Sequence, residues 1–329
     1  MALQKLTQRV QKDWLKVNQL IDRYLYADMP LANQIAQYIK TNMGKRIRPL
    51  LVLLSANAFS CQSPLRVSYA ASIELLHNAS LLHDDVIDES ELRRGKEAVH
   101  KRWNNKLSIL MGDLLIARAL QVLVNSNRSE QYKHSRMMSQ FIAQAAGQVI
   151  EGEVMQLANI GNAHFTEASY LKMIEKKTAK LFAASAMMGP FLSQGTEENM
   201  KCMQAFGVFI GIAFQLIDDV LDYTGDEREI GKRVGQDLKE GKWTLPLIVA
   251  FKKGDKRQKE CIQQALLSKN SKDVLAVQNV VEAVGAIEYT ARLSFSYRDQ
   301  ALAMLDRVSQ RIDKTGLEEF ACFIVERSK

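Results

Sequence analysis

Apolar residues recur at intervals of three or four along nearly the whole chain, which is the spacing of an amphipathic α-helix. The pattern first runs over residues 5–26, and a break follows near residues 29–30. Further helices are predicted over residues 50–59, 67–88, 167–189 and 205–225, with several more after residue 246. A turn is predicted at residues 61–64, and the glycine and proline at 189–190 are predicted to close a helix.

Several of these segments are apolar almost all round, as expected for helices at the centre of a bundle rather than on its surface. The chain has 329 residues, of which 47% are hydrophobic, so it can bury a large core. Five prolines and 17 glycines are few for an all-β protein of this length, and no Pro-, Gly- or Ser-rich linker interrupts the chain. We therefore predict an all-α fold, a single large helical bundle over residues 1–329, with residues 1–40 as a helical packing region without motifs.

The net charge of +7 does not indicate nucleic-acid binding, because basic residues alternate with acidic ones, as in 251–260, and no zinc-finger or RNP-type signature is present. The four cysteines lie far apart, which fits neither a zinc site nor a disulfide framework. Residues 1–25 lack the apolar core of a signal peptide, and no run approaches 18 apolar residues. We expect a cytoplasmic protein that could still touch a membrane surface transiently.

Two acidic clusters share one pattern. LLHDDVID (81–88) and QLIDDVLD (215–222) match as x-L-x-D-D-V-x-D, and each closes a long apolar helix. Each is also followed by a basic segment that contains glycine, RRGK (93–96) and GKRVGQDLKEGK (231–242). One such cluster could be a solvated helix end, but two copies after two buried helices favour a shared cleft.

The spacing of the acids indicates a cation. Asp84 and Asp88 are four residues apart and therefore share a helix face, and the pair at 218 and 222 does the same. Asp85 and its counterpart at 219 lie about 100° around their helices. Carboxylates without cysteine or histidine at ligand spacing suit a hard cation such as Mg²⁺, which keeps waters and is completed by substrate phosphate oxygens.

The neighbouring residues indicate the rest of the ligand. Arginine and lysine beside the acids can bind the phosphate oxygens that a metal does not reach. A GxxxxGK[ST] loop is missing, which argues against an ordinary nucleotide hydrolase. Apolar helix lies behind the acids, so a diphosphate head with a hydrocarbon tail, a prenyl diphosphate, is the predicted ligand.

With these motifs the chain resembles the trans-prenyltransferases, the all-E isoprenyl diphosphate synthases, from about residue 40 to its C-terminus. The motifs that carry the resemblance are GKRIRP (44–49), ELLHNASLLHDDVID (74–88), RRG (93–95), GD (112–113), GE with Gln156 (152–156), KTA (177–179), FQLIDDVLD (214–222) and GKRVGQDLKEGKWTLPL (231–247). The long-chain bacterial enzymes are the most similar members. The resemblance implies the isoprenoid synthase type of helical bundle with a central cavity, a homodimer, and Mg²⁺ as cofactor, with three ions bridged by substrate diphosphate.

The resemblance also assigns roles to residues. Those that match contacts to isopentenyl diphosphate are Lys45, Arg48, His77 and Arg94. Arg93 matches a contact to the allylic diphosphate, and positions near that diphosphate or the reacting carbons are matched by Lys177, Thr178, Gln215, Lys232 and Lys242. The metal-binding set comprises Asp84, Asp85, Asp88, Asp218, Asp219 and Asp222, and Asp84, Asp88 and Asp218 match the family's ligands most directly.

The spacing supports one of these assignments independently. His77 precedes Asp84 by seven residues, so it lies on the same helix face two turns deeper. A histidine on a helix is more often a satisfied core residue, but the shared face and the acids favour a ligand role. Gly44 before Lys45 and Pro49 after Arg48 likewise favour a fixed loop over a solvated one.

The implied reaction needs no protein nucleophile, which agrees with the lack of a Ser/His or Cys/His constellation. Magnesium and cationic side chains stabilise the departing diphosphate, and the double bond of isopentenyl diphosphate attacks the allylic cation. The proton that is then lost goes, in the family, to the released diphosphate. Apolar walls keep water away from the cation.

The residues upstream of the first acid motif bear on product length. Ala79 and Ser80 stand five and four residues before Asp84, where short-chain relatives carry an aromatic residue that blocks the tunnel. Small residues here predict a long product, octaprenyl diphosphate for quinone side chains, made from an allylic primer such as farnesyl diphosphate. Geranylgeranyl, heptaprenyl and nonaprenyl products remain open. Bulkier candidates for the tunnel floor are Met111, Leu115 and the Leu120–Leu123 region.

Two other classes are less consistent with the sequence. A terpene cyclase carries one DDxxD but usually has a different second motif and lacks the basic KRIRP-type site. A non-catalytic partner subunit typically loses one acid motif, whereas both are intact in this chain.

Overall fold

The chain folds almost entirely into helices. Its structure, a computed structural model, describes residues 2–126, 133–224, 235–268, 273–308 and 311–326. Within those ranges the regular strands form one short hairpin and everything else regular is helical. The all-α prediction is therefore confirmed, whereas the single-domain organisation and the central cavity stay predictions.

The helices of the first half are α1 (Ala2–Arg9), α2 (Gln11–Leu25), α3 (Pro30–Thr41), α4 (Ile47–Ala58), α5 (Leu65–Ile87), α6 (Val99–Arg102), α7 (Asn105–Ser126) and α8 (Lys133–Leu157). Those of the second half are α9 (Glu167–Ile174), the π-helix η1 (Glu175–Ala179), α10 (Lys180–Leu192), α11 (Glu197–Thr224), α13 (Gln236–Lys239), α14 (Leu245–Lys253), α15 (Lys256–Ser268), α16 (Val274–Ala283), α17 (Ala286–Arg307) and α18 (Thr315–Val325). The hairpin strands are β1 (Leu92–Arg93) and β2 (Lys96–Glu97).

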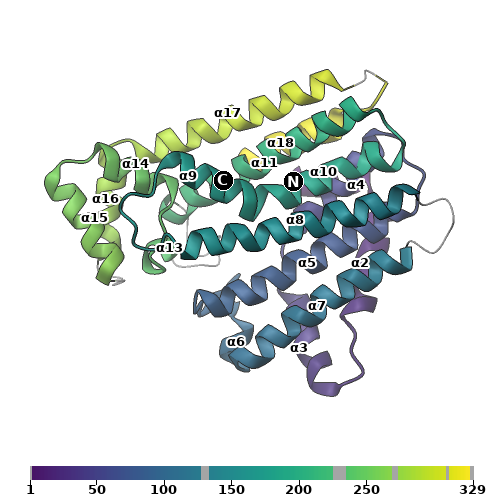
Figure 1. Cartoon of the computed structure of the whole chain (residues 1–329), viewed down its shortest axis with the longest axis horizontal. Helices are drawn as coiled ribbons and strands as arrows, with labels where there is room; N and C mark the ends of the chain where they lie inside the picture. Colours follow the sequence, from purple (N-terminus) through teal and green to yellow (C-terminus); the bar gives the residue numbers. More distant parts are fainter. Residues whose placement is uncertain (1, 127–132, 225–234, 269–272, 309–310, 327–329) are drawn as a thin grey trace.

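Long helices packed lengthwise make the bundle (Figure 1). Helix α5 packs against α2, α4 and α7, while α10 packs against α4, α8 and α11, and α11 also runs along α17. Helices α14, α15 and α16 gather at one end of the molecule, at the left of Figure 1, over a second apolar core. The larger core lies among the long helices. Both acid-bearing helices, α5 and α11, are thus held inside the bundle.

Most predicted boundaries agree with the structure. Pro30 is the first residue of α3, a position where the missing N–H of proline costs nothing. Helix α5 ends at Ile87 and α11 at Thr224, so each acid motif closes its helix as predicted. The helix predicted over 5–26 is instead two helices, which meet at Val10.

The prediction for residues 167–189 is wrong in two respects. The segment is not one α-helix, because the π-helical turn η1 interrupts it. It also does not end at Gly189 and Pro190 but continues to Leu192. Pro190 has no N–H for the carbonyl of Ala186 four residues earlier, and Ser55 Oγ of α4 donates to that carbonyl at 2.5 Å instead. A neighbouring helix thus replaces the missing hydrogen bond, which the sequence pattern does not reveal.

The hairpin after α5 was not predicted. Arg93 pairs with Lys96, and the two residues between them, Arg94 and Gly95, have φ angles of 53° and 75°. Two central residues with positive φ define a type I′ turn, which suits the twist of a two-residue hairpin. The turn sends the side chains of the two arginines to different neighbours.

By length and composition, two described helices could cross a membrane, α7 and α11. Within their most apolar windows, 39% of the α7 residues and 56% of the α11 residues are buried inside the protein. Buried core helices of a soluble protein meet the same criterion, so the finding is weak evidence for a membrane span.

Candidate active site

A lysine connects the segment that follows α11 to the acid-bearing end of α5. Lys242 follows the second motif in sequence, yet its Nζ lies 2.6 Å from Asp88 Oδ2 at the end of α5 and 2.6 Å from Glu240 Oε2. Burial opposes the charged form of Lys242, but Glu240 and Asp88 outweigh it, so the pKa of the ammonium is raised. A buried cation therefore lies beside the last acid of the first motif.

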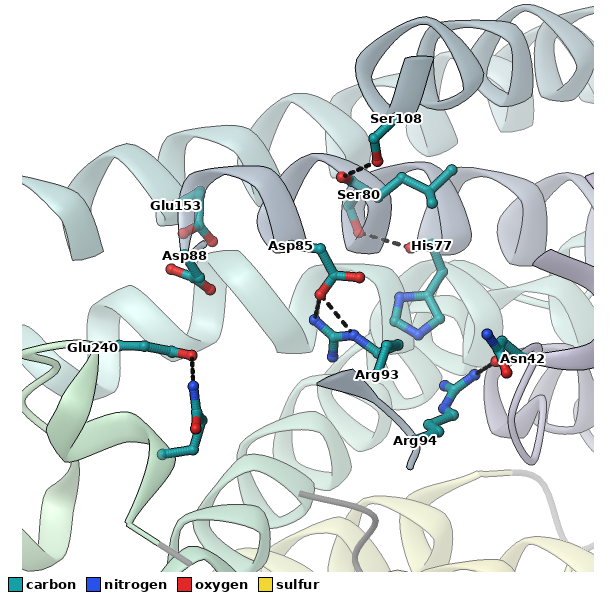
Figure 2. Close-up of polar contacts among 12 residues, drawn as sticks. Asn42, His77, Ser80, Asp85, Asp88, Arg93, Arg94, Ser108, Glu153 and Glu240 are labelled. Carbon is teal, nitrogen blue, oxygen red and sulfur yellow. Dashed lines mark hydrogen bonds and ion pairs between the residues drawn. The ribbon is translucent and has the colours of Figure 1, made fainter. Parts of the chain in front are cut away.

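Asp85 is bound by an arginine from the hairpin. The carboxylate is buried, and Arg93 donates to its Oδ1 from two nitrogens, with Nε at 2.8 Å (Figure 2). Burial by itself would lower the pKa of Arg93. The charge of Asp85 and its hydrogen bond outweigh burial, so the pKa of Arg93 is raised. In this state Asp85 holds Arg93 rather than facing an open space.

Asp84 lies in a crowded acidic environment. Burial raises the pKa of Asp84 to about 6; Lys177 opposes the shift, while Glu153 and Asp88 add to it. Glu153 comes from α8 and forms an ion pair with Lys177. Crowded carboxylates with shifted pKa values are typical of sites that bind a cation or perform chemistry.

The three aspartates of the second motif lie in different surroundings. Asp219 is 1% exposed, and its oxygens accept hydrogen bonds from Gln215 Nε2 at 3.0 Å, from the Leu245 N–H at 3.2 Å, and from the Tyr170 hydroxyl. Burial and the charge of Asp237 raise the pKa of Asp219 to about 7.

Asp222 accepts the backbone N–H groups of Gln236 at 3.2 Å and Asp237 at 3.3 Å, and thereby caps α13. Asp218 is half-buried on the same helical turn. Asp219 and Asp222 thus have structural partners that the spacing of the motif did not predict.

The π-helical turn η1 carries two of the predicted residues, Lys177 and Thr178. π-Turns inside α-helices are frequent at functional sites because they shift the side chains that follow them. Lys177 Nζ donates to Gln156 Oε1 at 3.2 Å in addition to its ion pair, and Thr178 Oγ1 donates to Gln215 Oε1 at 2.9 Å. A Cβ on Gly152 would clash with the Lys177 backbone, so glycine allows α8 to approach η1 closely.

A basic site lies deeper along α5. Arg48 is buried, its Nη1 lies 3.0 Å from His77 Nε2, and its guanidinium stands over the Phe182 ring, 4.6 Å from the centroid. Burial and Arg48 lower the pKa of His77 well below its ordinary value. The ring is therefore neutral at physiological pH, and its Nε2 can accept the hydrogen bond from arginine.

Arg94 completes this basic site from the hairpin. Its guanidinium donates to the carbonyl of Asn42 and packs where a side chain on Gly44 would lie (Figure 2). Lys45, next in that loop, is exposed. The structure therefore brings Arg48, His77 and Arg94 to one side of α5, with Lys45 on the rim.

The sequence interpretation missed several residues of the site. Glu153 and Glu240 were parts of quoted motifs without a role, and Tyr170 carried no signal at all. Glu74, buried beside Asn78 Nδ2 at 3.0 Å, was also overlooked, and burial raises the pKa of its carboxyl. Lys232 lies outside the described residues.

Within the described ranges no group of three or more His, Cys, Asp or Glu side chains is arranged to hold a metal ion. Ion pairs give the reason for the first motif, because Arg93 binds Asp85 and Lys242 binds Asp88. The donor set still fits a hard cation, since it consists of carboxylates; burial, with the nearby Glu153 and Asp88, raises the pKa of Asp84.

The candidate chain-length residues occupy two kinds of position. Ala79 is 1% exposed, and Ser80 is half-buried with its hydroxyl on the His77 carbonyl at 2.8 Å. Of the predicted floor residues, Met111 and Leu115 are buried, whereas Leu120 is 48% exposed. The inclusion of Leu120 in a tunnel floor is therefore wrong, because its side chain faces away from the core.

The chain matches the family model for polyprenyl synthetase over residues 29–284. The chain belongs to the polyprenyl synthetase family. Octaprenyl diphosphate synthase of Escherichia coli (strain K12) is 37% identical over 330 residues, which cover 100% of both chains. Geranylgeranyl diphosphate synthase of Sulfolobus acidocaldarius is 33% identical, over 95% of this chain and 96% of that one. The family therefore includes relatives with different product lengths.

A solved structure agrees in fold. Polyprenyl synthase from Caulobacter crescentus CB15, complexed with calcium and isoprenyl diphosphate, has a TM-score of 0.92 and 33% identity, covering 99% of this chain and 98% of that chain. The predicted family and the all-helical isoprenoid synthase fold are thus confirmed, and this protein is a prenyltransferase of a family that generally depends on Mg²⁺.

Proposed function

We propose that this polyprenyl synthetase condenses isopentenyl diphosphate repeatedly onto an allylic diphosphate, farnesyl diphosphate, to form all-trans octaprenyl diphosphate. The observation that carries the proposal is the Lys242–Asp88 contact, which ties the second acid motif's basic segment to the first acid motif. Two acid clusters and their cations then face one substrate diphosphate.

Magnesium is the proposed cofactor, as three ions held by Asp84, Asp88 and Asp218 together with substrate diphosphate. Once bound, it supplies positive charge to the diphosphate that leaves the allylic carbon. Asp85 and Asp219 already bind protein donors, and Asp222 caps α13. These three carboxylates therefore position neighbouring residues of the site.

The polar side chains of the site divide between two diphosphates. Lys45, Arg48, His77 and Arg94 receive isopentenyl diphosphate on one side of α5. The allylic diphosphate is bound by the remaining set, Arg93, Lys177, Thr178, Gln215, Lys232 and Lys242. Arg48 is fixed in advance by His77 and the Phe182 ring, so little ordering is needed when substrate binds.

No protein nucleophile takes part in the proposed reaction. The cations stabilise the departing diphosphate, the apolar helices exclude water, and the released diphosphate takes the final proton. This division of work explains why the site consists of charges and apolar walls alone.

The proposed product length rests on Ala79 and Ser80. Neither side chain fills the space beside α5 as an aromatic residue would. A cavity of about 230 Å³ lies at the far end of the same helix, lined by Leu65 and Ser68 with Val122 of α7 and Tyr24 of α2. Small residues near the acids and open volume at the other end of α5 both support a long product for quinone side chains.

We further propose a cytoplasmic homodimer that touches the membrane surface transiently during product release. Exposed apolar side chains on α7 and α8 support an interface: Leu110, Val124, Met137, Ile150 and Val154 are each about 60% exposed. A second copy would cover these side chains and remove their apolar surface from water.

The purified protein should convert farnesyl diphosphate and isopentenyl diphosphate, with magnesium, into long all-E products. Chromatography of the dephosphorylated products reports reaction class and chain length together. Cyclic hydrocarbons would assign the protein to the terpene cyclases, and no consumption of isopentenyl diphosphate would indicate a non-catalytic partner subunit. A shorter or longer linear product would support geranylgeranyl, heptaprenyl or nonaprenyl diphosphate instead.

A further inference from the structure

Four residues of α11 form one stripe that faces η1 and α10. Gly207, Gly211, Gln215 and Asp219 follow one another at intervals of four, so they share a helix face. A Cβ on Gly207 would clash with Ala183, and one on Gly211 would clash with Ala179. The glycines therefore let α11 approach η1 so closely that the next residue of the stripe, Gln215, reaches the Thr178 hydroxyl.

The last residue of the stripe fixes the direction of this hydrogen bond. Gln215 Nε2 donates to Asp219 Oδ1 at 3.0 Å, so its Oε1 must face the other way, where it accepts from Thr178 Oγ1 at 2.9 Å. The ionised form of Asp219 only accepts hydrogen bonds, and in that form this excludes the flipped amide. The hydroxyl hydrogen of Thr178 therefore points toward Gln215 Oε1.

Tyr170 of α9 binds the second oxygen of the Asp219 carboxylate. Its hydroxyl donates to Asp219 Oδ2, which also accepts the Leu245 N–H at 3.2 Å. Tyr170 and Asp219 are both fully buried, so neither can touch a substrate. Among the described residues, their hydrogen bonds lead to the reacting groups through Gln215 and Thr178.

We propose that Tyr170 is a positioning residue that acts through Asp219 to turn the oxygens of Gln215 and Thr178 toward the allylic carbon. Oxygen lone pairs fixed in advance stabilise positive charge that develops there, whereas amide or hydroxyl hydrogens would oppose it. This inference rests on the proposed function, and it assigns Asp219 to positioning rather than to magnesium.

The test compares Tyr170→Phe with Tyr223→Phe. Tyr223 is also buried, but its hydroxyl faces Thr244 Oγ1 at 3.4 Å instead of Asp219. Each variant is assayed for kcat and KM, and for binding of two farnesyl diphosphate analogues: a thiolodiphosphate without charge at the allylic position, and one with an ammonium group at that position.

We expect Tyr170→Phe to lower kcat by about 10- to 100-fold, while KM changes little. This loss is smaller than that caused by deleting a group that contacts the transition state directly. The ammonium analogue should lose affinity by a similar factor, and the thiolodiphosphate should bind as before. Tyr223→Phe should leave kcat and both affinities near the wild-type values. Equal weakening of both analogues, or matching behaviour of the two variants, would overturn the proposal.

Asp219→Asn provides a second test, because an asparagine amide can donate to Gln215 and flip it. We expect the same loss of kcat with an unchanged magnesium concentration for half-maximal activity. A marked increase in that concentration would show that Asp219 is a ligand instead. Failure of the proposed function is recognised separately, because the wild-type protein would then not consume isopentenyl diphosphate.

Discussion

Lys242 Nζ lies 2.6 Å from Asp88 Oδ2, although 154 residues separate them in the chain. The contact connects the basic segment after the second acid motif to the last acid of the first. Lys242 also balances Glu240, so one ammonium compensates two carboxylates in a buried setting.

Replacing Lys242 with alanine should therefore reduce activity strongly. We expect kcat to fall by about 10- to 100-fold, because the departing diphosphate loses a fixed cation. Steady-state kinetics measure the effect, and Lys239→Ala, at the end of the preceding short helix α13, is the control. Near-normal turnover in Lys242→Ala would show that the lysine only neutralises the acids.

Asp85→Asn separates two roles of the first motif. Since Asp85 holds Arg93, the variant should raise the KM for the allylic diphosphate by releasing that arginine, with the magnesium requirement unchanged. Kinetics at several magnesium concentrations distinguish the roles. A higher magnesium requirement at unchanged KM would instead make Asp85 a ligand, as its place in the motif predicts.

Product length should respond to residue 79. Ala79→Tyr should shorten the product sharply, because an aromatic ring beside α5 would block the growing chain; Ser80→Phe is a second variant at a less buried position. Chromatography of the dephosphorylated products measures the length. Leu120→Tyr, at an exposed position on α7, should give the wild-type product. An unchanged product in both α5 variants would refute the tunnel assignment.

Stability of the ligand-free protein should depend on pH through His77. Burial and Arg48 lower its pKa in the folded protein well below 6.5, the ordinary value that applies in the unfolded chain. The unfolded chain therefore binds more protons below pH 6.5, and stability falls there by up to about 1.4 kcal/mol per pH unit.

His77→Gln should remove this slope, because a glutamine oxygen can accept from Arg48 at every pH. Thermal melts between pH 7 and pH 5 measure it, with exposed His164→Gln as the control. Parallel melting curves for wild type and His77→Gln would contradict the assignment.

Ser55→Ala should destabilise the bundle by roughly 1–3 kcal/mol, since the carbonyl of Ala186 would be buried without a partner. Denaturant unfolding measures the loss. Ser185→Ala is the matched control, because the Leu181 carbonyl that Ser185 contacts belongs to a regular helical turn and keeps its backbone partner. Equal losses in the two variants would show that only serine packing matters.

The sequence by itself determined the helices, the ends of α5 and α11, and the family. Helical periodicity is a local property, and the acids at positions i and i+4 share a face whatever the rest of the fold does. The same local reasoning failed at Pro190, because Ser55, which replaces its missing hydrogen bond, lies on another helix.

Helix packing decides which donors and charges surround each acid of the two motifs. Asp85 and Asp219 look equivalent to Asp84 and Asp218 in the motif, yet Arg93 binds one and Tyr170 with Gln215 binds the other. Those partners come from a hairpin and from a different helix. A carboxylate's role depends on which charges and donors surround it after folding, and helix packing sets those neighbours.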